Sequence, residues 1–234
     1  MKKSSRLLSV KGFTRVDAHT FANDAYGILV KNISAEQANG FSSALLGQGI
    51  ETEVVAQAEL PALPQTKFLQ RLDCTPDALL IYDAIGRSFP LEWQHVMLIA
   101  TGCVRTTKFN RVEKPSWSTS DSEGGTYETT SVSSVEERAN RLLLEIIVSG
   151  AVLRYSVSAE QFRFDYLGER RTKSLPENFA LLVQDLAASA PHAMLNRGAF
   201  FLKQNENLFP YPTKNAFLEE ISWLLWRMKR EGRF

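Results

Sequence analysis

Few residues in this chain have the types and spacing that catalysis or metal binding requires. The three histidines, His19, His95 and His192, are far apart, and none has a cysteine, a carboxylate or another histidine at metal-ligand spacing. Glu219 and Glu220 are adjacent near the start of a predicted helix, where acidic side chains favour the helix dipole, and a catalytic carboxylate pair is the alternative. The sequence therefore predicts no metal site, no cofactor and no catalytic residue, which favours a non-enzymatic role.

The glycine and cysteine residues also predict no dinucleotide site and no metal site. Gly47 and Gly49 form Gly-x-Gly at a predicted helix end but lack the third glycine of a dinucleotide site. Cys74 and Cys103 have no metal-ligand partners and are expected to be small buried hydrophobic residues. Whether these two cysteines pair in a disulfide stays open at this point.

A local cluster of positive charge is the best candidate for a binding site. Residues 105–114 carry four basic side chains against one acidic side chain, whereas residues 115–137 carry five acidic side chains and no basic one. The second segment is rich in Ser and Thr, so we expect a long mobile acidic loop over 115–137, inserted between two strands. It is a phosphorylated or partner-gated loop, an acidic flap over the basic stretch, or a tolerated surface insertion. The candidate binding residues are Arg105, Lys108, Arg111 and Lys114.

Length and composition set the broad class. The 234 residues suit one large domain or two small ones, and 44% hydrophobic residues are typical of a globular protein. The net charge of +1 argues against nucleic acid as the main partner, because phosphate binding needs a concentrated basic surface. We see no secretion-signal core and no apolar run of membrane-spanning length, so the protein is expected to be cytoplasmic and without an integral membrane segment.

The amino-terminal part predicts a small α/β unit. After an N-terminal arm (1–24), residues 25–58 read as strand, helix and strand, the pattern of half a ferredoxin-like fold. Ser34 and Gln37 form a capping box at the start of the helix, and residues 50–56 are the returning strand. Pro61 and Pro64 then indicate an extended linker over 59–66.

Residues 67–191 predict an antiparallel β domain closed by a helix. Ser174 and Glu177 form a second capping box at the start of that helix. Residues 142–148 are almost continuously apolar and are typical of a central buried strand, and residues 67–72 are a further strand candidate. Six strands are predicted over 79–83, 89–93, 96–100, 142–148, 153–157 and 162–167.

The carboxy-terminal extension, 192–234, contains a predicted helix over 213–230. Phe217, Ile221 and Leu224 lie on one arc of this helix, whereas Trp223 and Trp226 fall outside it. A helix that is apolar on two sides must pack between two bodies, so the tryptophans predict an interface. The helix lies either between the two domains or in a homodimer.

The order of these elements resembles bacterial pleckstrin-homology-like domains. The likeness lies in residues 79–83, the turn at Gly86, and Trp93 leading into an apolar strand. The resemblance implies an antiparallel barrel or sandwich. Members of that family bind lipids, peptides or other proteins. The turn that would hold a phosphoinositide has one basic residue, Arg87, which argues against lipid. The amino-terminal unit is similar to small bacterial domains described as signal-transducing.

The fold class expected is therefore α+β. A ferredoxin-like half is followed by an antiparallel pleckstrin-homology-like barrel or sandwich with a closing helix, and by an extra C-terminal helix. The function expected is a non-enzymatic protein-interaction or regulatory module with a protein partner. An enzyme whose site is assembled from scattered residues is one alternative. The other is a peripheral binder of anionic ligands or membrane surfaces, acting through the basic cluster.

Overall fold

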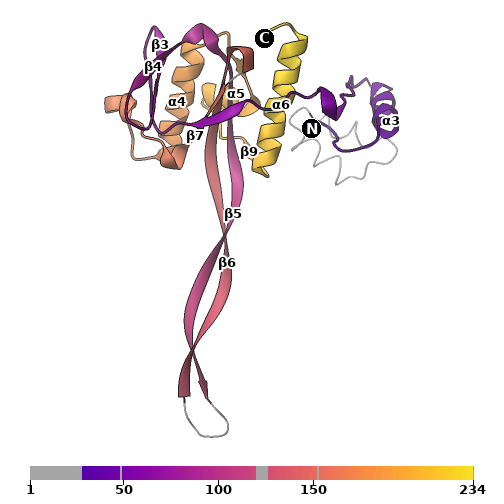
Figure 1. Ribbon diagram of the computed structural model, residues 1–234. Helices are drawn as coiled ribbons and strands as arrows, with labels where there is room; N and C mark the ends of the chain where they lie inside the picture. The colour runs from indigo at the N-terminus through magenta and orange to yellow at the C-terminus, as the bar shows by residue number, and fades with distance from the viewer. Residues whose placement is uncertain (1–27, 48, 120–125, 152, 234) are drawn as a thin grey trace.

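Two long strands, β5 (Val96–Thr119) and β6 (Thr126–Val148), organise the molecule. In the computed structural model they form one antiparallel hairpin that begins inside the body and continues far beyond it (Figure 1). The structure describes residues 28–47, 49–119, 126–151 and 153–233. Residues 107–119 and 126–138 are described by their backbone alone. We call 96–106 with 139–148 the inner hairpin, and 107–119 with 126–138 the outer hairpin.

The inner hairpin is the centre of a mixed six-stranded sheet. β6 pairs with β7 on one side, and β5 pairs with two short parallel strands on the other. A separate three-stranded antiparallel sheet has the order β2-β3-β4. The remaining strands are β1 (Gln65–Phe68), β2 (Leu72–Cys74), β3 (Ala78–Tyr82), β4 (Ser88–Glu92), β7 (Leu153–Ser158), β8 (Met194–Leu195) and β9 (Pro210–Tyr211).

The helices begin where the sequence provides a side-chain cap. Ser34 and Gln37 form the predicted capping box, Ser174 accepts from the backbone N–H of Glu177, and Thr213 accepts from that of Ala216. The α-helices are α3 (Ala35–Leu46), α4 (Leu175–Ser189), α5 (Arg197–Lys203) and α6 (Lys214–Arg230). Short 3-10 turns are η1 (Gln57–Glu59), η2 (Trp93–His95), η3 (Ser149–Ala151), η4 (Ala159–Gln161) and η5 (Asp165–Arg170).

The core lies on both faces of the inner hairpin. On one face Ile99 and Leu144 pack with residues of α4 and of the small sheet. On the other face Leu98 and Ile147 pack with residues of α6 and with Phe209 and Tyr211. A strand covered on both faces is apolar at successive positions, which confirms residues 142–148 as a central buried strand.

The predicted ferredoxin-like half is wrong in its strands and confirmed in its helix. Residues 28–30 and 50–56 are irregular backbone, while Tyr26 and Gly27 lie outside the described residues. Residues 51–56 are largely exposed, and the described part of the chain gives them no neighbouring strand with which to pair. Their β-branched side chains therefore have no buried surface to cover.

The predicted barrel is also wrong, because the described residues form two open sheets. Five of the six predicted strands are present, but residues 162–167 form 3-10 turns and connecting backbone instead of a strand. The alternation there has another cause. Phe162 and Phe164 both enter the core, and their rings make an edge contact with 4.9 Å between centroids. The backbone N–H of Arg163, between them, donates to the carbonyl oxygen of Gln70.

The predicted loop over 115–137 is wrong as well. Residues 115–119 belong to β5 and residues 126–137 to β6, while 120–125 lie outside the described residues. Thr and Val favour extended backbone, and pairing of the two strands satisfies their amide groups without an apolar core. Asn196 is the N-cap of α5, a short helix in the carboxy-terminal extension that no sequence pattern predicted.

Candidate functional site: the outer hairpin and its base

The outer hairpin is the most distinctive feature of the molecule. Its register runs without interruption from Thr107 opposite Arg138 to Thr119 opposite Thr126. At about 3.4 Å per residue, the ribbon reaches roughly 45 Å beyond the last body residues. Figure 1 shows it leaving the sheet as a single twisted ribbon.

No other described strand or helix covers this ribbon. β6 pairs with β7 only through residues 143–147, and β5 pairs with β9 only as far as Val104. From Thr106 outward, among the described residues, the two strands pair with each other alone. Each strand therefore presents one edge of backbone N–H and C=O groups with which no strand in the described part of the chain pairs.

A buried amide holds β5 at the base of the outer hairpin. Asn196 is 1% exposed, and its Nδ2 donates to the carbonyl oxygen of Thr101 and to Oη of Tyr211, each at 2.9 Å. Its Oδ1 accepts from the backbone N–H groups of Thr101 and Ala199, also at 2.9 Å. One side chain thereby joins β5, α5 and β9.

Two glycines allow the close approach that this arrangement needs. A Cβ at Gly198 would overlap the carbonyl oxygen of Thr101, and a Cβ at Gly102 would lie 2.5 Å from Cδ2 of Tyr211. Neither glycine has a positive φ, so space and not backbone conformation requires the missing side chain. Residues 101 and 102 of β5 are therefore clamped between α5 and β9.

The same network continues to a buried carboxyl on α6. Oη of Tyr211 donates to Glu220, which is 3% exposed. Burial raises the pKa of Glu220, although the hydrogen bonds from Tyr211 and from the backbone of Arg197 act to lower it. The network thus links the base of the outer hairpin to the C-terminal helix through hydrogen bonds.

A second buried carboxyl lies in the centre of the sheet. Glu145 of β6 accepts from Oγ of Ser156 at 2.8 Å and lies 3.7 Å from Nε of Arg154, both on β7. Burial raises the pKa of Glu145 despite the opposing effects of Arg154 and Ser156. Arg154 also donates to Thr66 of β1, so the pair ties three strands together.

A broad groove of about 2090 Å³ lies between residues 28–63 and the outer side of α6. Trp223 and Trp226 line it, with the guanidinium groups of Arg227 and Arg230 over their rings at 5.0 and 5.4 Å. Ion pairs join the two sides, from Lys31 to Glu219 and from Arg230 to Glu53. The structure thus places the amino-terminal segment beside the tryptophans predicted to form an interface.

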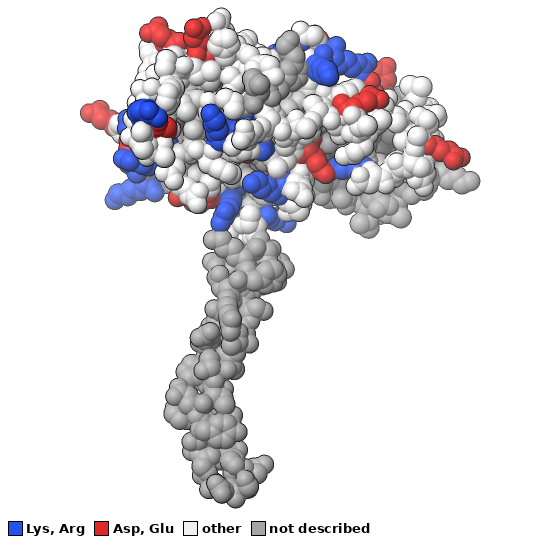
Figure 2. All heavy atoms as spheres, viewed as in Figure 1, with Lys and Arg blue, Asp and Glu red and all other residues white. Residues whose placement is uncertain are grey.

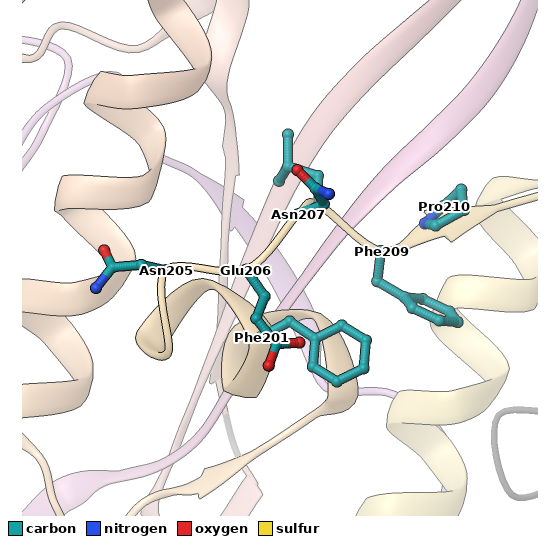
Figure 3. A pocket seen from close by; sticks show the side chains of 7 residues that line it. Phe201, Asn205, Glu206, Asn207, Phe209 and Pro210 are labelled. Atoms are coloured by element: carbon teal, nitrogen blue, oxygen red, sulfur yellow. The ribbon is translucent and has the colours of Figure 1, made fainter.

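A smaller pocket of about 380 Å³ lies between α5 and β9 (Figure 3). Phe201 and Phe209 form one side, with the guanidinium of Arg197 4.5 Å from the Phe209 ring centroid. Asn205, Glu206, Asn207 and Leu208 of the connecting loop and Pro210 of β9 complete the lining. Glu206 is the one acid among these residues, which is too little for a general acid and base pair.

The four basic residues predicted as a binding site all lie on β5. Arg105 is exposed at the base of the outer hairpin. Figure 2 shows Lys and Arg side chains gathered on the body around the point where the hairpin leaves it. Lys108, Arg111 and Lys114 follow on the outer hairpin at intervals of three. Because a strand has a period of two, this spacing assigns successive members to opposite faces of the ribbon.

Of the other residues considered from the sequence, His95 has a side-chain neighbour and the two cysteines are not paired. Nδ1 of His95 lies 3.2 Å from Oγ of Ser149, and both cysteines are free, half-buried thiols. Burial raises the pKa of Cys74 to about 12. Within the described ranges no three His, Cys, Asp or Glu side chains are grouped to hold a metal ion, and no described helix is long and apolar enough to cross a membrane. Comparison with protein-family models, curated proteins and solved structures gives no match to this chain.

Proposed function

We propose that this protein is a non-enzymatic interaction module that engages other polypeptides through the outer hairpin. The observation that carries the proposal is the two-stranded ribbon that extends past the last strand contact of the body. An isolated two-stranded hairpin is marginal in water, and a third strand or a packed surface normally stabilises it. A partner would supply that surface.

The base of the ribbon supports the same function. Asn196 and Tyr211 fasten the inner part of β5 to α5, β9 and α6, and the sheet itself is buried on both faces. A ribbon held so rigidly at one end presents its outer part at a defined direction from the body. Such an arrangement suits binding at a distance better than catalysis, which needs convergent groups in a water-excluded site.

Charge argues against nucleic acid as the partner. A two-stranded β-ribbon fits the DNA major groove, but residues 107–138 contain four basic and six acidic side chains, a net charge of −2. An anionic membrane surface is disfavoured for the same reason, and because the basic positions alternate between faces. A polypeptide partner, unlike nucleic acid or an anionic membrane, requires no excess of positive charge on the ribbon.

The test compares the full chain with a variant in which an Asn-Gly turn replaces residues 107–138. Thr106 and Ala139 face each other, with Oγ1 of Thr106 donating to the carbonyl oxygen of Ala139 at 3.0 Å, so a two-residue turn closes the inner hairpin. Both proteins carry the same affinity tag and are purified gently from the native host. Stoichiometric polypeptides, including untagged copies of the chain, are quantified by mass spectrometry.

We expect the full chain to retain at least one stoichiometric polypeptide that the shortened variant loses. For the comparison to hold, the body must be folded in both proteins, which the same midpoint of thermal unfolding would show. Equal recovery by both proteins, or recovery by neither, would show that the outer hairpin is not an interaction element.

A further inference from the structure

We infer that the outer hairpin pairs with a second copy of this chain, edge to edge through β6. This inference rests on the proposed function and names the partner. Two antiparallel β6 strands, related by a two-fold axis, would build a four-stranded sheet in the order β5-β6-β6-β5. Each copy would then satisfy the free edge of the other.

The two edges of the ribbon differ in how well they resist pairing. The outer part of β5 contains Lys108, Arg111, Lys114 and Pro115, residue types with which natural proteins block an exposed edge. β6 over residues 129–135 reads TTSVSSV, with no charge, no proline and no glycine. A seven-residue segment of this composition is a favoured site for strand addition. The β6 edge is therefore the one open to a partner.

The charges of β6 are self-complementary in one two-fold register. An axis through Ser133 places each residue opposite the one equally far on the other side, so that Glu128 faces Arg138 of the second copy. The symmetry creates this opposite-charge pair twice. Glu136 and Glu137 then face Thr130 and Thr129, so no two like charges are opposed.

The length of the ribbon matches the same register. With the axis at Ser133, Thr126 near the tip lies opposite Asn140 of the second copy, at the base. The strands therefore overlap along the whole outer hairpin, and the two bodies lie at opposite ends of the shared sheet. An axis one pair away, at Val132, would set Glu128 against Glu136, which like-charge repulsion disfavours.

Sedimentation velocity of the full chain over the micromolar range tests the association directly. We expect a monomer–dimer equilibrium that the Asn-Gly variant lacks. Arg138→Glu and Glu128→Arg should each weaken the dimer roughly tenfold, because two attractive cross-strand pairs become repulsive, and the double exchange should restore it. Within the hairpin these positions face Thr107 and Trp117, which carry no charge, so the folded ribbon tolerates both changes.

A matched control changes the same charge on the other strand. Glu113→Arg alters β5, away from the proposed interface, and should leave the dissociation constant unchanged. As a second readout, Ser133→Cys lies on the axis and should give a disulfide-linked dimer on mild oxidation, whereas Ser116→Cys on β5 should not. Cys74 and Cys103 are half-buried with raised pKa values, which disfavours their reaction.

A chain that stays monomeric at all concentrations would overturn the inference. So would a dimer that survives removal of the outer hairpin, or one that ignores both charge reversals and does not cross-link at position 133. If a monomeric chain still captures a different protein through the outer hairpin, the proposed function stands and the second copy is excluded as the partner.

Discussion

The inner and outer halves of one hairpin have opposite surroundings. Leu98, Leu144 and Ile147 of the inner half are fully buried, with helices on both faces and further strands on both edges. The outer half continues the same register with neither a covering layer nor a third strand among the described residues. The change occurs within a few residues of Thr106, where β9 and β7 end their contact with the hairpin.

This difference separates the parts that hold the fold from the part that is available for binding. Burial of apolar surface stabilises the inner half, and β7, β8 and β9 pair with its edges over part of their length. Among the described residues, no further strand or helix pairs with or covers the outer half, and its two outer edges stay open. Changes in the two halves should therefore affect stability and association independently.

The largest effect on stability should come from Gly198→Ala at the base. The new Cβ would overlap the carbonyl oxygen of Thr101, and because that oxygen is backbone, α5 must move away from β5. We expect a loss of about 3 kcal/mol in the free energy of unfolding, measured by urea denaturation. Gly40→Ala on α3 is the control. Its Cβ meets open space, and it should stabilise by about 0.5–1 kcal/mol.

A smaller effect should appear as a pH dependence. The pKa of Glu220 is raised above its ordinary value of 4.5, so the folded chain binds its proton more tightly than the unfolded chain. The free energy of unfolding should therefore fall as pH rises above 4.5 and through the folded-state pKa. Glu220→Gln should make this decline shallower, because an amide still accepts from Tyr211 but does not titrate.

Chemical denaturation at a series of pH values measures that slope. Glu219→Gln, on the exposed side of the same helix turn, leaves the buried carboxyl in place and should keep the decline. The pKa of Glu145 is also raised, so this carboxyl accounts for the slope that remains in the Glu220→Gln variant. A wild-type stability that rises over this pH range would contradict the assignment of these two carboxyls.

The smallest effect on stability should come from the largest deletion. Replacing residues 107–138 by Asn-Gly should change the free energy of unfolding of the body by no more than about 0.5 kcal/mol at low protein concentration. Hydrogen exchange should locate the same boundary, with amides of residues 98–104 far more protected than those of 107–119 in the monomer. A loss of several kcal/mol would mean that the outer hairpin belongs to the folding core.

Several elements followed from local patterns. The capping boxes at Ser34 and Ser174 and the apolar arc over 213–230 predicted three helices, and the continuous apolar run over 142–148 predicted the central strand. Capping and periodicity act over a few residues, so a local pattern can reveal them. The alternation at Phe162 and Phe164 wrongly predicted a strand, because a turn can also direct two aromatic rings into a core. The short β8 and β9 have too few residues for any period to appear.

For this protein the sequence by itself determined the starts of α3, α4 and α6, the buried strand and the +1 charge that argues against nucleic acid. Only the tertiary structure decided that residues 115–119 and 126–137 are strand and not loop, because their pairing joins residues as far apart as Lys108 and Glu137. Only the tertiary structure brought Asn196, Thr101 and Tyr211 together at the base. Contacts between distant segments create these sites, and no local pattern encodes them.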